Sequence, residues 1–168
     1  MRRKQSNPAF SLIELLVTLS LLLIVSSLAT SYISLTHYPV RATLEKLALD
    51  FIFLQQSALT TGKKQILTLD LQTNSYAYHK RHEPFIHGVQ FGTILGAQGP
   101  PSSPKQTIIE PITFEKSLVV FYPDGKMQPG ALYVCDEAHY YLYALTVPVS
   151  HVSSLYKYRY QKNHWERI

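Results

Sequence analysis

Cysteine is almost absent from this chain of 168 residues, because Cys135 is its only example. A single cysteine excludes an internal disulfide and a cysteine-based zinc site, and it leaves the redox compartment open. Charged residues are also few, at 16%, whereas hydrophobic residues make up 46%. This balance argues against intrinsic disorder, and the length excludes a multidomain enzyme. We therefore expect one small domain with a buried core, plus one further element.

Positive charge is scarce outside the N-terminal tip. The formal net charge is +5, but Arg2, Arg3 and Lys4 supply three of the positive charges, so the remaining chain would carry only +2. Binding to nucleic acid through bulk charge needs a strongly basic protein. Such binding is not expected of this chain as a whole, and only a local basic patch could support it.

Motifs of catalysis and metal binding are missing as well. There is no G-x-x-x-x-G-K-[ST] phosphate loop, so residues 136–139, which spell a helicase box, are interpreted as a polar turn between strands. No G-x-S-x-G elbow is present, and Cys135 lies in a strand-like run typical of a small buried hydrophobe. His79, His82 and His87 lack the companion ligands of a zinc motif and are interpreted as a solvated strand end and loop. We expect no enzymatic activity, no cofactor and no metal ion.

What the chain does have is a long apolar segment near its start. From Phe10 to Leu35 there are 26 residues, with Glu14 as the single charge. As a helix rising about 1.5 Å per residue they would span roughly 39 Å, more than the hydrocarbon core of a bilayer at about 30 Å. The basic tip favours a cytoplasmic N-terminus. We predict that residues 10–36 cross a membrane and that the bulk of the chain faces the other side.

Two ordinary interpretations of this segment leave Glu14 unexplained. One is a secretory signal, with Ser27 and Ala29 as the small pair and a cut after Ala29, but the apolar run exceeds the roughly 7 to 15 residues of a usual signal core. The other is an uncleaved anchor. In a membrane segment an unpaired acidic side chain costs on the order of a few kcal/mol, and such groups usually have a function.

The residues around Glu14 resemble a known processing motif. A basic tip is followed by the residues Ala9-Phe10-Ser11-Leu12-Ile13-Glu14-Leu15-Leu16. This segment is similar to the type IV prepilin motif. In that motif a short leader is cut before a phenylalanine, and glutamate is the fifth mature residue. The resemblance implies that residues 1–9 are a leader, that a prepilin peptidase cleaves between Ala9 and Phe10, and that Phe10 is then N-methylated. The family prefers glycine before the cut, and Ala9 is a small substitute.

The same resemblance implies a role for Glu14 in assembly. Cleavage would create an amine at Phe10 with an unperturbed pKa of about 7.7 to 8.0, mostly protonated at neutral pH. In an isolated subunit the Glu14 carboxylate gains from the positive end of its own helix. In the family, this glutamate pairs with the N-terminal amine of a neighbouring subunit. Such an ion pair offsets two desolvated charges and fixes the axial register of a helical filament.

An amphipathic pattern follows the apolar segment. A 4-3-4-3-4 spacing places six apolar residues on one helical stripe: Val40, Leu44, Leu47, Phe51, Leu54 and Ala58. We predict a helical half over residues 37–61, which ends at Gly62 and packs on a globular head. Counted from Phe10, the whole helix would have roughly 52 residues and a length of about 78 Å. Pro39 should kink it and free the carbonyl of Leu35.

Alternating patterns dominate after this helix. Residues 65–71 and 75–79 are predicted to form a hairpin. Further strand candidates are residues 107–109, 112–114, 118–122, 131–135, 140–147 and 155–160. Residues 96–104 are predicted to be a surface loop by composition. Because only one long helix accompanies these strands, we predict an α+β fold in which the helix packs on a small antiparallel β-rich head formed by residues 62–168.

The order of these elements adds to the resemblance. A long helix, a hairpin and Val120-Phe121-Tyr122-Pro123-Asp124-Gly125 before a further strand look like the GspH/FimT-type minor pseudopilins. Residues 123–125 should form a tight turn, because proline presets one dihedral angle and glycine allows another. The resemblance implies a structural subunit of the pseudopilus that drives type II protein secretion. It leaves open a minor pilin of a type IV pilus involved in DNA uptake.

The C-terminal strand candidate allows two interpretations. Its tyrosines would share one face: Tyr156, Tyr158 and Tyr160. We favour an edge strand whose aromatic face is packed and whose opposite face, with Lys157 and Arg159, discourages edge pairing. The alternative is a basic and aromatic tail that contacts nucleic acid through Lys157, Arg159 and Lys162.

Together these patterns predict a type IV prepilin-like protein, a minor pseudopilin held in a bacterial inner membrane by a single span, with its head in the periplasm. The expected partners are the prepilin peptidase, other pseudopilins in a helical filament, and secreted cargo, whereas nucleic acid is not expected. The competing hypothesis is a secreted β-rich binding protein released after Ala29, whose mature chain would lack Glu14.

Overall fold

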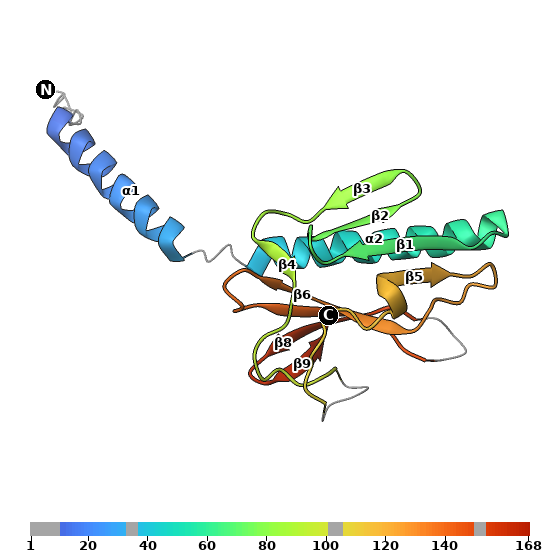
Figure 1. Cartoon of the computed structure of the whole chain (residues 1–168). Helices are drawn as coiled ribbons and strands as arrows, with labels where there is room; N and C mark the ends of the chain where they lie inside the picture. The colour runs from blue at the N-terminus through green and yellow to red at the C-terminus, as the bar shows by residue number, and fades with distance from the viewer. Residues whose placement is uncertain (1–10, 33–36, 101–105, 150–153) are drawn as a thin grey trace, which may run out of the picture. The chain divides into compact units, whose positions relative to one another are not determined.

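The computed structural model describes residues 11–32, 37–100, 106–149 and 154–168. The chain divides into two compact units, Met1–Leu35 and Thr36–Ile168. The first unit contains helix α1 (Leu12–Tyr32), which is labelled in Figure 1. The second, the globular unit, contains a helix and two antiparallel sheets.

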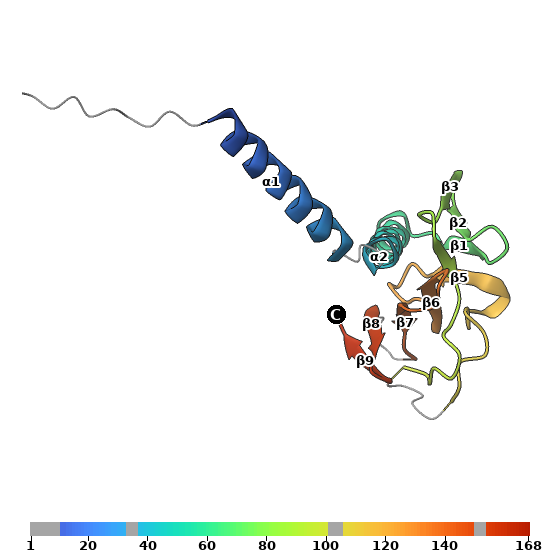
Figure 2. The same cartoon turned by 90° about the vertical axis from the view of Figure 1, so that its left-hand side faces the viewer.

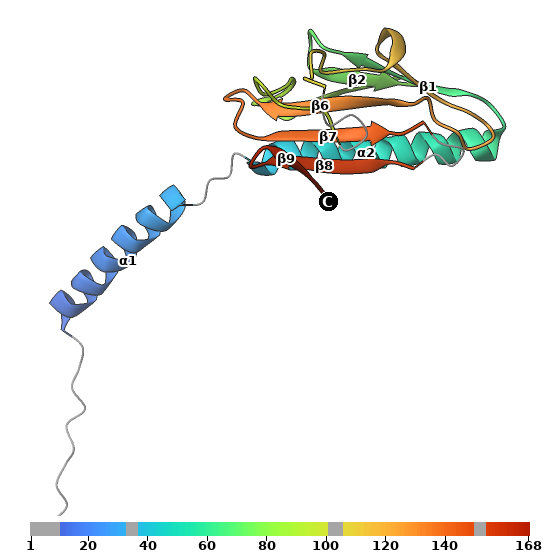
Figure 3. The same cartoon turned by 90° about the horizontal axis from the view of Figure 1, so that it is seen from below.

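The globular unit has the α+β fold that the sequence predicts. It begins with helix α2 (His37–Thr61). Sheet A has the strand order β3-β2-β1-β5, formed by β1 (Gln65–Asp70), β2 (Ser75–Tyr78), β3 (Arg81–Pro84) and β5 (Leu118–Phe121). Sheet B has the order β4-β6-β7-β8-β9, formed by β4 (Val89–Phe91), β6 (Gly130–Asp136), β7 (Leu142–Val147), β8 (Tyr156–Gln161) and β9 (His164–Arg167). A short 3-10 helix, η1 (Glu115–Ser117), precedes β5. Figure 3 shows β6, β7 and β8 side by side.

Helix α2 buries the stripe that the spacing predicts, because all six of those residues are fully buried. It ends at Thr61, and Gly62 follows with a φ of +64°, a conformation that glycine adopts without strain. Pro39 lies in the first turn of α2, where a missing N–H leaves no helical bond unmade. Pro39 therefore kinks no described helix. The predicted continuity of the long helix falls on residues 33–36, outside the described residues.

The main hydrophobic core lies between α2 and both sheets. Phe121 of sheet A and Leu145 of sheet B are fully buried in the same cluster as the α2 stripe. The Phe51 ring packs edge to face against Phe114 and Phe121, with centroids 6.3 and 5.4 Å away. Figure 2, which looks nearly along α2, shows the helix beside both sheets. The helix is thus the element that joins the two sheets.

A second core covers the other face of sheet B, where residues of β6 and β7 are buried together with Ala97. The prediction of a surface loop over residues 96–104 is wrong for its first part, since Ala97, Gly99 and Pro100 are buried. Small side chains let this backbone approach the sheet closely, which composition alone does not indicate. Residues 101–105 lie outside the described residues.

Most of the predicted strands are present. The hairpin is confirmed as β1 and β2, and four further candidates are confirmed as β5, β6, β7 and β8. Residues 107–109 and 112–114 are not strands, because only isolated bridges form there, from Thr107 to Gln98 and from Ile112 to Leu132. The patterns do not predict β3, β4 and β9, which are edge strands of three or four residues.

The tight turn predicted at residues 123–125 is confirmed. The N–H of Gly125 donates to the carbonyl of Tyr122 at 3.0 Å, and Gly125 has a φ of +84°. The side-chain amide of Gln55 on α2 donates to the carbonyl of Gly125 at 2.7 Å. The turn is therefore also held against the helix.

Asp50 of α2 fixes the helix to sheet A. The hydroxyl of Tyr76 donates to its Oδ2 at 2.5 Å, and the hydroxyl of Tyr78 donates to its Oδ1 at 3.0 Å. Both tyrosines are buried. Burial, together with the hydrogen bond to the carboxylate, raises the pKa of Tyr76, so its hydroxyl stays a donor. One carboxylate thus satisfies two buried side chains of β2.

Replacing Asp50 with alanine should lower the free energy of unfolding by about 2 to 3 kcal/mol, because two buried hydroxyls lose a charged acceptor. Asp124 is a matched control, since its carboxylate pairs with Lys126 in an exposed turn, and D124A should change stability far less. Urea unfolding of the full chain in detergent micelles measures both variants. Equal losses from the two substitutions would contradict the role given to Asp50.

Candidate assembly surface

Helix α1 is apolar on all sides. The described side chains of α1, residues 12–27, are all exposed, and most are large aliphatic groups. Its hydroxyl groups bond to the helix itself: Thr18 donates to the carbonyl of Leu15 at 2.9 Å, and Ser20 donates to that of Leu16 at 2.8 Å. A helix that is hydrophobic all round is stable where lipid or other protein surrounds it. The surface of α1 therefore needs a nonaqueous environment.

Glu14 is the single charge in α1 and lies in its first turn. Its backbone N–H donates to the side-chain oxygen of Ser11 at 3.3 Å and to the Ser11 carbonyl at 3.1 Å, so Ser11 caps the helix. Among the described residues, the Glu14 carboxylate has no hydrogen bond and no ion pair, and the side chain is exposed. Within the described residues, its position and exposure leave this carboxylate available for a further partner.

The two predicted processing residues, Ala9 and Phe10, lie outside the described residues. Within the part of the chain that the structure describes, no helix combines the length and apolarity required to cross a membrane. The span predicted over residues 10–36 starts and ends beyond the described part of α1, and it stays a prediction.

Helix α2 also has apolar side chains that point away from the core. This outward stripe consists of residues with 48% to 67% of their surface exposed: Tyr38, Leu49, Ile52, Phe53 and Leu59. At 100° per residue, Tyr38, Leu49 and Phe53 lie opposite the buried stripe of the same helix, whereas Ile52 and Leu59 lie to one side of it. Contiguous exposed apolar residues usually mark an interaction surface. The apolar spacing predicts the buried stripe alone, although the same helical count also indicates an outward one.

The C-terminal cations have different surroundings. The Nζ of Lys157 donates to the carboxylate of Glu45 on α2 at 2.6 Å, with the two side chains 30% and 37% exposed. Arg159 lies opposite Glu166 in the β8–β9 register, and Lys162 lies in the turn between these strands. Lys157 already has an acidic partner. Nucleic-acid contact through the three cations stays a prediction.

Strand β8 is not the edge strand that the sequence predicts, because β9 pairs with it and takes the edge. Lys162 and Asn163 both have positive φ and form a two-residue hairpin turn, although they are not the usual asparagine-glycine pair. The packed aromatic face is confirmed: the rings of Tyr158 and Tyr160 lie 6.4 and 5.0 Å from that of Trp165.

The histidines of the sequence analysis have separate partners. His79 hydrogen-bonds to Gln65 at 2.7 Å, and His82 hydrogen-bonds to Ser75 at 3.0 Å. Among the described residues, no group of three histidine, cysteine, aspartate or glutamate side chains could hold a metal ion.

Cys135 is fully buried, as its strand-like surroundings predict, and this burial raises the pKa of its thiol to about 11. The thiol is therefore protonated at neutral pH and is a poor nucleophile. The polar turn predicted at residues 136–139 is confirmed, with the N–H of His139 donating to the carbonyl of Asp136 at 2.9 Å.

Comparisons with known proteins connect these features. A family model described as the prokaryotic N-terminal methylation motif matches residues 4–30, which include Ala9, Phe10 and Glu14. The chain is also similar to a solved structure of the minor pseudopilin EpsH from the type 2 secretion system of Vibrio cholerae. The TM-score is 0.50 and the sequence identity 11%, and the match covers 69% of this chain and 94% of that chain. The chain thus has the N-terminal methylation motif and a pseudopilin-like fold.

At this identity, the likeness of the chain to EpsH shows the fold: a helix packed on antiparallel sheets. A second structure of EpsH from the type II secretion system of Vibrio cholerae matches with a TM-score of 0.48 and 12% identity. That match covers 71% of this chain and 94% of that chain. No curated protein sequence matches this chain.

Proposed function

We propose that this chain is a minor pseudopilin, a structural subunit of the short periplasmic filament of a type II secretion system. The observation that carries the proposal is the single carboxylate of Glu14 in the first turn of a helix that is otherwise apolar on every side. A plain membrane anchor does not require that charge, whereas a filament subunit uses it to pair with a neighbouring subunit. The methylation motif that includes Glu14 supports the same proposal.

Assembly follows from these residues in order. A prepilin peptidase removes residues 1–9 at the cytoplasmic face of the inner membrane, and Phe10 becomes the methylated N-terminus. Helix α1 stays in the membrane until the subunit is lifted into the filament. There the Glu14 carboxylate pairs with the Phe10 amine of a neighbour, and apolar helices replace lipid around α1.

The outward stripe of α2 extends the proposed contact into the globular unit. Its apolar side chains are 48% to 67% exposed, so they can pack on helices of neighbouring subunits with little disturbance of the core. The fold shared with EpsH, a minor pseudopilin by its description, supports the minor class. The proposed role is structural and not enzymatic, in keeping with the protonated, buried Cys135.

Expression with a prepilin peptidase should yield a membrane-extracted protein whose N-terminal residue is methylated Phe10. Intact-mass measurement and N-terminal sequencing provide this test, and the same strain without the peptidase is the control, in which Met1 to Ala9 should be retained. A mature chain that begins at Thr30 would instead support the secreted protein. A chain that keeps its leader in the presence of the peptidase would contradict the proposal and support an uncleaved membrane anchor.

A further inference from the structure

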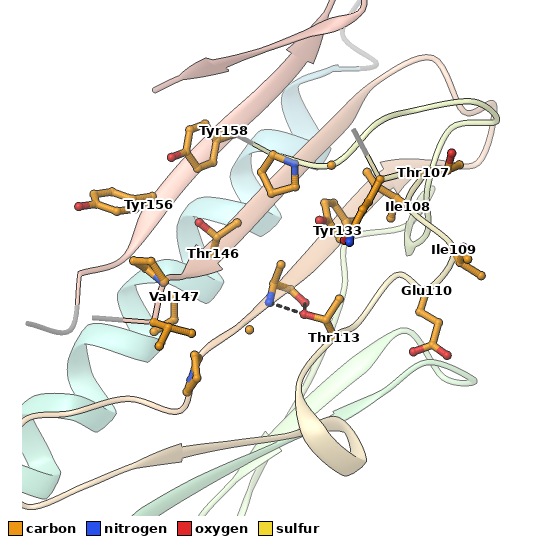
Figure 4. A pocket seen from close by; sticks show the side chains of 18 residues that line it. Thr107, Ile108, Ile109, Glu110, Thr113, Tyr133, Thr146, Val147, Tyr156 and Tyr158 are labelled. Carbon is orange, nitrogen blue, oxygen red and sulfur yellow. Dashed lines mark hydrogen bonds between the residues drawn. The ribbon is translucent and has the colours of Figure 1, made fainter. Parts of the chain in front are cut away.

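Sheet B has a hollow of about 900 Å³ on its face opposite α2, shown in Figure 4. Tyr133 of β6, Thr146 of β7 and Tyr158 of β8 lie along its floor, and residues 107–110 lie along one side. Ligand sites in proteins usually have volumes of about 300 to 1,000 Å³. The sheet B hollow is therefore large enough for a partner of several residues.

The rim of the sheet B hollow is apolar and exposed. Ile109 on one side and Val149 on another have 88% and 89% of their surface exposed. Single exposed aliphatic residues are common on proteins, but here two of them border a floor that contains aromatic rings. Burying the rim and the partly exposed rings of Tyr156 and Tyr158 would favour association with a partner that has apolar side chains of its own.

Among the described residues that line the sheet B hollow, the one charged side chain is acidic. The whole sequence has 16 lysines and arginines against 11 acidic residues, yet the described residues that line the hollow include one carboxylate, Glu110, and no basic side chain. Among the described residues, Glu110 forms no ion pair. The carboxylate of Glu110 attracts a cation and repels a phosphate group.

One ring at the hollow already binds a guanidinium group. Arg167 of β9 lies over the ring of Tyr156, with its Cζ atom 4.1 Å from the ring centroid, and Tyr156 lines the hollow. The face of a tyrosine ring attracts arginine and lysine through its quadrupole. A second cation that binds beside Tyr158 would make the same kind of contact with the face of a tyrosine ring.

We propose that the sheet B hollow is a docking groove for an extended segment of another polypeptide that carries an arginine or lysine next to apolar residues. The cation pairs with Glu110, and the apolar side chains of the segment lie on Tyr133 and Tyr158 between the exposed Ile109 and Val149. The proposal does not depend on filament assembly, because every residue in it belongs to the globular unit.

Trp165 provides the readout for a binding experiment. It is the only tryptophan of the chain, and its ring lies 6.0 Å from that of Tyr133 and 6.4 Å from that of Tyr158. The full chain in detergent micelles is titrated with a pool of hexapeptides that have a fixed central arginine and apolar flanking residues. Matched pools carry citrulline or glutamate at the fixed position, and a single-stranded oligonucleotide is titrated separately.

The arginine pool should change the Trp165 fluorescence saturably, and the citrulline pool should bind about tenfold more weakly, since it lacks the charge-assisted contact. Glu110→Gln should weaken binding of the arginine pool by the same factor. Glu137→Gln, in the exposed turn after β6, is the matched control and should leave it unchanged. Equal binding of the arginine and citrulline pools, a preference for glutamate or the oligonucleotide, an unaffected Glu110→Gln variant, or no binding by any pool would each overturn the proposal.

Discussion

Replacing Glu14 with glutamine should leave the protein processed and membrane-anchored, but should reduce its incorporation into filaments at least about tenfold. The proposed pair between Glu14 and a neighbour's Phe10 amine is desolvated in the filament. Breaking such a pair leaves a buried charge without compensation, and typical losses of about 3 to 5 kcal/mol exceed a tenfold change in affinity. The fraction of protein recovered in filaments sheared from cells, or cross-linked to neighbouring subunits, measures the effect.

Glutamine separates assembly from helix capping. Ser11 and Glu14 have the spacing of a capping box, and glutamine serves as well as glutamate at the third helical position of that motif. The Glu14→Gln variant therefore keeps the start of α1 and loses only the charge. Thr18→Ala is a control one turn along the helix, because the Thr18 hydroxyl bonds only to the carbonyl of Leu15 among the described residues. If the Glu14→Gln variant assembled normally, the proposed pair with a neighbour's Phe10 amine would be wrong. Glu14 would then only be a favourable charge at a helix N-terminus.

Features that depend on neighbours in the sequence could be predicted from the sequence. The core stripe of α2 follows from a spacing that repeats along one helix, and the β1–β2 hairpin follows from alternation on both sides of a turn. The position of Glu14 in the first turn of α1 could also be predicted from its neighbours in the sequence. Ser11 as its cap was missed, although its signal, serine three residues before glutamate, is plain in the sequence.

Features that depend on distant parts of the chain could not be predicted. The ion pair between Lys157 and Glu45 joins residues 112 positions apart, and no local pattern indicates it. Edge strands such as β9 are short and charged, so they lack the alternation that marks a half-buried strand. The sheet B hollow combines side chains from β6, β7, β8 and residues 107–110, so it exists only once sheet B has formed.

Replacing each of two phenylalanines of α2, two positions apart, with alanine should affect different properties: stability for Phe51 and assembly for Phe53. Phe51 is fully buried and packs on Phe114 and Phe121, whereas Phe53 is 54% exposed in the outward stripe. Phe51→Ala should lower the free energy of unfolding by about 3 to 5 kcal/mol, through lost burial and the cavity left behind. That is a large part of the total stability of an ordinary domain, about 5 to 15 kcal/mol.

Phe53→Ala should cost about 1 kcal/mol or less, because only its ring contact with Tyr78, at 6.5 Å between centroids, is lost. Its expected effect is on assembly, since the outward stripe would lose one of its two aromatic rings while the core stays intact. Unfolding in urea and recovery in sheared filaments, measured for both variants, separate stability from assembly. If Phe53→Ala assembled normally, the outward stripe would have no part in subunit contacts. If it unfolded as readily as Phe51→Ala, the division of α2 into a core stripe and an outward stripe would be wrong.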